Sequence, residues 1–319
     1  MTYQDDDEEV KTYSQLVALL ESSLAAFMDK EVERFKSMLS LFQPPASVVV
    51  APSEKKWRVA AVDGGSSILS FADIDVAFIA ALAVIDDGRE FRRIVSQPKL
   101  LIQEYGEPEG NFADRVDVER ETMMLMLAQR VVREESPDLL VVDGPLIPRP
   151  KYVGEYVLQL KNLLSLDSET MVVGFVKRPH SRYLSNLPLT DRALLSTCLE
   201  KFSASPWPPA TMTAFEGVSD TPVRYTYLRL LEEPESGLFR IDMHPSIDNL
   251  TAYEILSYLA YTSDPQKGPP SILMKADEEV KVSRRLVAEL YRSCFTTIAS
   301  KAEPKLWAPL ILRWGERVW

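Results

Sequence analysis

Two aspartates in this sequence occupy positions that suit the binding of a cation. Asp63 and Asp143 each follow four apolar residues, and each precedes a glycine. Short apolar runs of this kind predict buried strands, and the sites of open sheets lie beyond the carboxyl ends of strands. If the two strands are neighbours, the carboxylates converge, and like charges that close require a cation or a shared proton.

The residues after Asp63 predict a sharp turn. Gly64 and Gly65 permit backbone conformations and close approaches that other residues do not, and the hydroxyl groups of Ser66 and Ser67 follow directly. A charge at the end of a buried strand is costly unless a partner neutralises it, so a metal ion or a phosphate would explain the motif. The alternative is a hairpin turn with Asp63 in a turn position.

A predicted helix over residues 115–134 supplies a third acid. Glu121 falls on the apolar face of this helix, whereas Glu119 lies on a more polar side. Buried carboxylates are rarely unpaired, so we expect Glu121 to join Asp63 and Asp143 in a hard-oxygen site for Mg²⁺ or Mn²⁺. The alternative is that Glu121 lies at the exposed end of the apolar face and extends its carboxylate into water.

A fourth acid, Asp277, follows a predicted strand over residues 272–275. It also precedes Glu278 at the start of a predicted helix over residues 278–293, where an aspartate is a favourable N-cap. The two roles are compatible, so Asp277 is a candidate both for a helix cap and for a metal ligand.

The order of the predicted elements is typical of an α/β fold. Strands come first and then alternate with helices, which predicts a mixed sheet with helices on its faces. The predicted strands cover residues 58–62, 76–85, 91–95, 139–142, 170–176, 223–230, 238–243 and 272–275, and the predicted helices cover residues 13–41, 115–134, 152–164, 252–261 and 278–293. We expect an acidic tip and an N-terminal helical arm over residues 1–50, followed by one domain over residues 51–319.

Composition narrows the class of protein. The 319 residues are 46% hydrophobic and 26% charged, as in a globular protein that folds in water. No run approaches the roughly 18 apolar residues of a membrane span, and the acidic residues 5–9, a predicted disordered tip, do not resemble a secretory signal. Two cysteines are too few for a disulfide framework, which favours a cytoplasmic location. The net charge of −11 means that DNA binding would need a local basic path.

Taken in order, the motifs resemble those of the NurA family. The resemblance extends from about residue 57 to about residue 292 and rests on residues 62–66, the acidic helix, and residues 142–146, 176–177 and 270–277. NurA is a nuclease that works with a HerA-type hexameric ATPase in the end resection of DNA double-strand breaks. The resemblance implies an RNase H-like core and a homodimer with a central DNA channel. It also implies Mn²⁺- or Mg²⁺-dependent cleavage of single-stranded DNA, by endonuclease activity and by 5′–3′ exonuclease activity.

By this resemblance, the acidic residues of the family correspond to acids of this chain. The two strand-end aspartates of the family fall on Asp63 and Asp143. The helix glutamate of the family falls on Glu121, with Glu119 as the alternative. The implied chemistry is metal-assisted hydrolysis of a phosphodiester, with Asp277 as a fourth ligand.

Two departures from the family pattern bear on the rate of cleavage. The late family motif usually ends in Ala-His, but here Asp277 follows Ala276. An aspartate is still a ligand for a hard cation. The family often carries a tyrosine a few residues earlier, and here that place is taken by Pro269 or Pro270, which have no hydroxyl group. A weakened or inactive nuclease is therefore an alternative interpretation.

Basic residues near the predicted strand ends are candidates for contacts with DNA. Lys177 follows a buried strand, so its ammonium group is expected near the scissile phosphate. The expected DNA-binding residues are Ser66, Lys177, Arg178, Arg182 and Lys275. The alternative for the residues around Arg178 is a solvated loop.

Two other functional classes compete with the nuclease interpretation. An actin-like or sugar-kinase-type ATP-binding enzyme shares the RNase H-like core, but it predicts a second glycine-rich phosphate turn. Here Pro145 removes a backbone donor from the turn after Asp143, and no Gly-Gly pair follows Gly65. The other class is a dimeric adaptor of the HerA-type ATPase without cleavage, with the N-terminal helix and the tail Trp307–Trp319 as partner surfaces. The chain has no Walker A motif, so ATP hydrolysis would come from the partner.

Overall fold

The computed structural model describes residues 4–70, 75–104, 106–147, 154–182, 184–205, 212–213, 222–233, 237–244, 246–281 and 284–301, so the tail Trp307–Trp319 lies outside the described residues. The chain divides into two units, Met1–Pro45 with His180–Cys198 and Ala46–Pro179 with Leu199–Trp319. The domain boundary expected after residue 50 stays a prediction. None of the helices in the described part of the chain has the length and apolar character that crossing a membrane requires.

The first unit contains the predicted helical arm. Helix α1 spans Gln4–Leu39, so the helix predicted over residues 13–41 is confirmed and begins earlier than expected. The prediction that residues 5–9 are disordered was wrong, because they lie in the first turns of α1. Acidic residues near the N-terminus of a helix are favoured by the helix dipole. The unit also contains the short helix α4, Asp191–Leu195.

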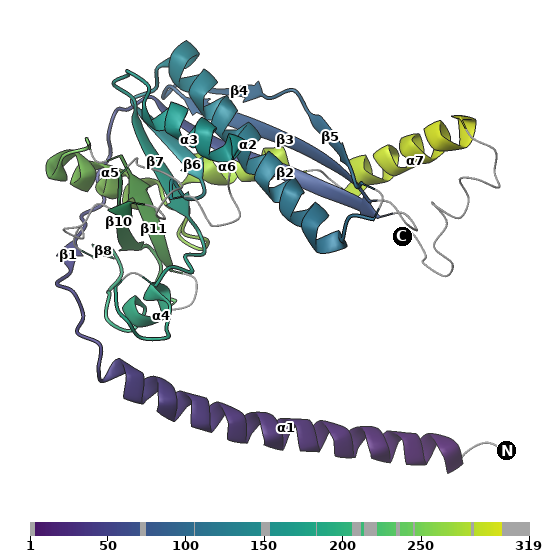
Figure 1. The fold of residues 1–319 in the computed structure, drawn as a ribbon. Coiled ribbons are helices and arrows are strands. Elements are labelled where there is room, and N and C mark those ends of the chain that lie inside the picture. The colour runs from purple at the N-terminus through teal and green to yellow at the C-terminus, as the bar shows by residue number, and fades with distance from the viewer. Residues whose placement is uncertain are drawn as a thin grey trace. The chain divides into compact units, whose positions relative to one another are not determined.

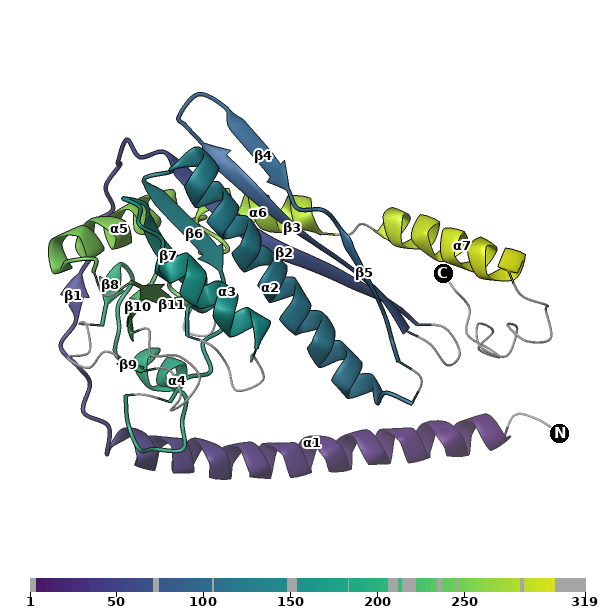
Figure 2. The same cartoon turned by 45° about the horizontal axis from the view of Figure 1, so that its top comes forward.

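The second unit is built on a mixed sheet (Figures 1 and 2). Its strands are β1 (Val48–Val49), β2 (Val59–Ser70), β3 (Asp75–Asp86), β4 (Phe91–Val95), β5 (Lys99–Ile102), β6 (Leu139–Asp143), β7 (Met171–Val176), β8 (Ser203–Ala204), β9 (Met212–Thr213), β10 (Pro222–Arg229) and β11 (Leu238–Met243). The order across the sheet is β1-β8-β10-β11-β7-β6-β2-β3-β4, with β5 beside β3 and β9 beside β10. Strand β6 is parallel to both of its neighbours, β2 and β7, and the other strand pairs of the described sheet are antiparallel.

Helices cover both faces of this sheet, which confirms the expected α/β architecture (Figure 1). They are α2 (Glu109–Glu135) and α3 (Glu155–Leu164), and α5 (Asn249–Thr262) and α6 (Ser271–Val280), whereas α7 (Arg284–Lys301) extends beyond the sheet (Figure 1). On one face, Phe112 of α2 packs with Ala77 and Ile79 of β3. On the other face, α5 and α6 join a core with residues of β2, β6 and β7. The parallel strands are therefore buried from both sides.

Strand β2 does not end at Asp63 as predicted. It continues through Gly64 and Gly65 to Ser70 and pairs with β3 along its whole length, whereas its parallel pairing with β6 ends at Val62. Figure 2 shows β2 and β3 extending beyond β6. The two glycines serve close packing rather than a turn, since a Cβ on Gly64 would lie 2.8 Å from Cγ of Arg120.

The strand predicted over residues 272–275 was also wrong, because these residues lie in helix α6. A short apolar run does not distinguish a strand from a buried helix segment. The buried positions of α6 recur at helical spacing and pack into the core that β2 also joins. They are Ile272, Leu273, Ala276 and Val280. Asp277 therefore lies inside a helix near its C-terminal end and is not an N-cap.

Candidate metal centre

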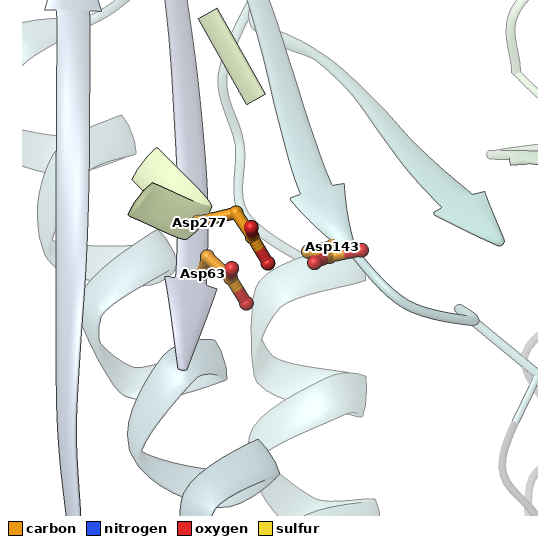
Figure 3. Close-up of side chains that lie close together, drawn as sticks. All are labelled: Asp63, Asp143 and Asp277. Carbon is orange, nitrogen blue, oxygen red and sulfur yellow. The ribbon is translucent and has the colours of Figure 1, made fainter. Parts of the chain in front are cut away.

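Three aspartates from distant parts of the chain converge at the end of the parallel strands (Figure 3). Asp63 lies within β2, Asp143 ends β6, and Asp277 projects from α6. One carboxylate oxygen from each lies within 4.8 Å of the others. The register explains the first pair, because the last parallel pairing joins Val62 to Val142 and the two aspartates follow directly.

Asp63 is the most buried of the three aspartates, and its carboxyl group has a strongly raised pKa. Only 6% of Asp63 is exposed. Its burial, reinforced by the negative charge of Asp143, raises the pKa of the Asp63 carboxyl to about 8, against opposing effects of Lys177 and the Gly64 amide. The Gly64 amide donates a hydrogen bond of 2.7 Å to Asp63 Oδ1. This carboxylate is therefore held in place but carries an electrostatic cost that a cation would remove.

Two lysines neutralise part of the negative charge. Nζ of Lys177 lies 2.6 Å from Asp143 Oδ2 and 3.4 Å from Asp277 Oδ1, and Lys281 forms an ion pair with Asp277. Burial alone would lower the pKa of Lys177, but the carboxylates, led by Asp143, raise it above its usual value. For Asp277, burial would raise the pKa, but Lys281 and Lys177 together lower it. Lys177 and Asp277 are therefore both charged at neutral pH.

Glu121 lies in the same cavity but is not one of the three converging carboxylates. It is 8% exposed, and its Oε1 lies 2.8 Å from Nη2 of Arg120. Its Oε2 lies 3.4 Å from the position that a Cβ on Gly144 would take, which places the carboxylate beside the residue after Asp143. Glu119 instead pairs with Lys99, at 2.6 Å, outside this cavity. The structure thus favours Glu121 over Glu119 as the helix acid.

The carboxylates open into a cavity of about 550 Å³. Arg120, Lys177, Arg178 and Lys281 contribute positive charge to its lining, and Ser66 contributes a hydroxyl group. Arg120 and Lys281 were not among the site residues predicted from the sequence. Lys281 lies one helical turn after Asp277, a spacing that would have been visible if residues 272–275 had been assigned to a helix.

Two of the predicted DNA-binding residues, Lys275 and Arg182, are not among the residues that line the cavity. Nζ of Lys275 is 3.6 Å from the centroid of the Phe91 ring. Arg182 belongs to the first unit. Of the five predicted residues, Ser66, Lys177 and Arg178 are therefore the ones beside the carboxylates.

Glycines let the two helices come close enough to complete the site. A Cβ on Gly65 would lie 2.3 Å from the carbonyl oxygen of Val280, at the end of α6. A Cβ on Gly64 would meet Arg120 on α2. The bare backbone of β2 therefore allows α6 to bring Asp277, and α2 to bring Glu121, toward Asp63.

The donor set fits a divalent metal ion. Carboxylate oxygens are the ligands that Mg²⁺ and Mn²⁺ prefer. When Asp63 is ionised, three carboxylates face the ammonium groups of Lys177 and Lys281, and burial, reinforced by Asp143, opposes this ionised state by raising the pKa of Asp63. A divalent cation would supply the missing positive charge.

The fold and the acidic site define an α/β protein that gathers three carboxylates where its central parallel strands stop pairing. A family model described as the NurA domain matches residues 58–282, more than half of the chain. The chain therefore belongs to the NurA family, and the resemblance inferred from its motifs is confirmed.

Solved structures of NurA proteins share this fold. The structure of the NurA nuclease from Sulfolobus solfataricus has 18% sequence identity and a TM-score of 0.59, with 95% of this chain and 99% of that chain covered. A second NurA structure has 13% identity and a TM-score of 0.64, with 88% and 98% covered. A NurA structure bound to dAMP and manganese has 14% identity and a TM-score of 0.57, with 97% and 100% covered. Among curated proteins, none matches this chain.

Proposed function

We propose that this protein is a divalent-metal-dependent DNA nuclease that hydrolyses phosphodiesters of single-stranded DNA. The observation that carries the proposal is the cluster of Asp63, Asp143 and Asp277 beside Lys177, in a cavity with a partly basic lining. The related protein that binds dAMP and manganese supports Mn²⁺ as the cation, with Mg²⁺ as the alternative. By family resemblance, the expected activities are endonuclease cleavage and 5′–3′ exonuclease cleavage.

The residues of the cavity divide between binding the cation and binding the substrate. Asp63, Asp143 and Asp277 would hold the cation, and Glu121 is a further candidate ligand. When bound, a divalent cation lowers the pKa of the attacking water and neutralises charge that develops on the leaving oxygen. Once the carboxylates are neutralised, Lys177 can donate a proton of Nζ in a hydrogen bond to a non-bridging phosphate oxygen.

The remaining basic residues would guide the DNA backbone. Arg120, Arg178 and Lys281 line the cavity and supply the local basic path that a chain with a net charge of −11 requires. Ser66 adds a hydroxyl donor from β2. Contacts from Lys275 and Arg182 to DNA would have to lie outside this cavity or in the other unit.

Partners follow from the family and not from the geometry of the site. We propose a cytoplasmic homodimer that acts with a HerA-type hexameric ATPase in the end resection of double-strand breaks. The competing proposal is a dimeric adaptor with weakened cleavage, and the aspartate at position 277, where the family usually has histidine, motivates it. Lys281 forms an ion pair with Asp277 and would compete with a cation for this carboxylate, so Asp277 is the ligand on which the two proposals differ.

The proposed function is tested by cleavage of labelled single-stranded DNA with Mn²⁺, with Mg²⁺ or with EDTA. We expect metal-dependent cutting by the wild type and loss of cutting by Asp63→Ala, while Glu119→Ala, outside the cavity, keeps activity. If the isolated wild type does not cut, the assay is repeated with a HerA-type ATPase. A continued absence of cutting, with DNA or partner binding intact, would overturn the nuclease proposal and favour the adaptor.

A further inference from the structure

Strand β11 carries an ion pair that the proposed chemistry does not use. Nε of Arg240 lies 2.7 Å from Oδ1 of Asp242, and Nη2 lies 2.9 Å from Oδ2. Arg240 is 5% exposed and Asp242 is not exposed at all. Well-packed apolar residues often stabilise a core as well as a buried ion pair does. Stability alone is therefore a weak explanation for this pair.

Asp242 also holds a neighbouring part of the chain. Its Oδ2 accepts a hydrogen bond of 3.0 Å from the backbone amide of Leu146. Leu146 is fully buried and lies three residues after Asp143, at the far end of the turn that carries this carboxylate. Asp242 thus connects the centre of the sheet to the turn of the proposed metal centre.

The register of the sheet shows how the turn reaches Asp242. Val142 of β6, Gly174 of β7 and Asp242 of β11 lie in one row across three strands. A Cβ on Gly174 would lie 2.6 Å from the carbonyl oxygen of Gly144 and 3.1 Å from the amide nitrogen of Leu146. The turn therefore crosses directly over the bare backbone of Gly174, and its Leu146 amide meets the carboxylate on the far side.

The other contacts of the turn fix its near end and its middle. The Gly144 amide donates a hydrogen bond of 3.1 Å to the carbonyl oxygen of Phe175, and the Tyr156 hydroxyl group contacts the carbonyl oxygen of Pro145 at 3.4 Å. Gly144 has a φ of +139°, which strongly favours glycine. Within residues 144–147, the described part of the turn, these contacts together with the Asp242 hydrogen bond fix the path of the chain next to Asp143.

We propose that Asp242, held in place by Arg240, is a positioning residue for the metal ligand Asp143. Its carboxylate anchors the Leu146 amide, and this anchor fixes the turn that sets the distance of Asp143 from Asp63 and Asp277. This inference rests on the proposed function, because it treats Asp143 as a metal ligand. Residues that orient metal ligands typically contribute about 10- to 100-fold to metal affinity or activity.

The test separates the hydrogen bond from the buried charges. In Arg240→Met with Asp242→Leu, both charges are replaced by apolar groups of similar size, so the core stays filled while the Leu146 amide loses its acceptor. In Arg240→Met with Asp242→Asn, the amide oxygen of the asparagine remains as an acceptor without charge. Thr226→Val removes a different buried polar group from β10 and serves as the matched control.

The readouts are Mn²⁺ affinity, measured by titration of the metal-free protein without DNA, and the kcat and KM of DNA cleavage. For the leucine variant we expect Mn²⁺ affinity and kcat to fall about 10- to 100-fold, with the KM for DNA unchanged. The asparagine variant should recover most of the affinity, and Thr226→Val should match the wild type. If the leucine variant does not fold, Arg240→Met with Asp242→Ala is measured in its place.

Wild-type Mn²⁺ affinity in the folded leucine variant would overturn the proposal. So would an asparagine variant that loses as much affinity as the leucine variant, since the acceptor would then be irrelevant. A wild type that binds Mn²⁺ without cutting DNA overturns only the proposed function, and the affinities still decide the role of Asp242. A wild type that does not bind Mn²⁺ overturns both proposals.

Discussion

Two clusters of charge lie in the same sheet and differ in how their charge is balanced. On β11, Arg240 and Asp242 neutralise each other with paired hydrogen bonds and no exposed carboxylate. Where the parallel pairing of β2 with β6 ends, Asp63 and Asp143 are like charges, and burial, reinforced by Asp143, raises the pKa of Asp63 to about 8 against the opposing effect of Lys177. The balanced pair, Arg240 with Asp242, needs no further ion. The unbalanced cluster around Asp63 and Asp143 favours the binding of a cation from solution when its carboxylates are ionised.

The largest expected difference follows from making the same substitution in both clusters. Asp63→Asn removes a ligand and should reduce metal-dependent cleavage by more than the roughly 100-fold expected for a residue that only orients a ligand. In EDTA at pH 8.5 it should nevertheless unfold at a higher urea concentration than the wild type, because a costly buried charge is gone. Asp242→Asn should instead cost about 3–5 kcal/mol of stability, since it leaves Arg240 buried without a counter-charge. Urea denaturation of both variants checks the opposite signs, and equal signs would contradict the comparison.

The two lysines of the unbalanced cluster should contribute unequally. Lys177 contacts Asp143 and Asp277, whereas Lys281, among the described residues, pairs with Asp277 and is more exposed. Lys177→Met should lower kcat about 100-fold, as expected for loss of a donor to the reacting phosphate. It should also bind Mn²⁺ at least as tightly as the wild type, because a competing ammonium group is removed. Lys281→Met is the matched control, and a larger loss of kcat in this variant would show that the roles are reversed.

The helix acids provide a test at smaller scale. Glu121→Gln should lower Mn²⁺ affinity or cleavage about 10-fold, the low end of the range for groups that support a metal site. Glu119→Gln should have little effect, because the exposed ion pair with Lys99 lies outside the cavity. Metal titration and cleavage assays on both variants decide the assignment. Equal effects would remove Glu121 from the site.

The pH dependence of the metal-free protein should reveal the unbalanced cluster. The pKa of Asp63 in the folded chain, about 8, lies above its ordinary value of 3.8. Between these two pH values the folded chain therefore binds a proton that the unfolded chain has lost. The stabilising contribution is complete below about pH 3.8, falls by up to about 1.4 kcal/mol per pH unit, and is lost at about pH 8. Unfolding in EDTA at pH 5, 6, 7 and 8 should show this fall in the wild type. Asp63→Asn is the control, and an equal fall in that variant would assign the effect to another group.

The sequence was most informative where local pattern and function coincide. Asp63 and Asp143 were identifiable because each interrupts an apolar strand, and Glu121 because it interrupts an apolar helix face. Asp277 was selected from the wrong local structure, since Ile272 to Lys275 is compatible with both a strand and a helix. Gly64 and Gly65 were recognised as sites of close approach, but the partner that approaches them is set by tertiary packing.

Asp242 and Arg240 could not be assigned a role from the sequence. They alternate with apolar residues in β11, a pattern typical of a strand with one polar face. That polar face is buried here, because the turn after β6 covers it. Only the order of strands across the sheet brings residue 146 to residue 242, and no local pattern encodes that order.

The wide separation of Asp63, Asp143 and Asp277 along the chain has a consequence for how the protein is made. Contacts between residues so distant in sequence form late, because the entropy of closing long loops must be overcome first. During synthesis the β2–β3 hairpin and the β6 turn leave the ribosome long before α6. A nascent chain would therefore hold two carboxylates without the third, and a complete site would exist only after α6 docks on Gly65. If all three aspartates bind the metal, as proposed, the chain gains its DNA-cutting site only when folding is finished.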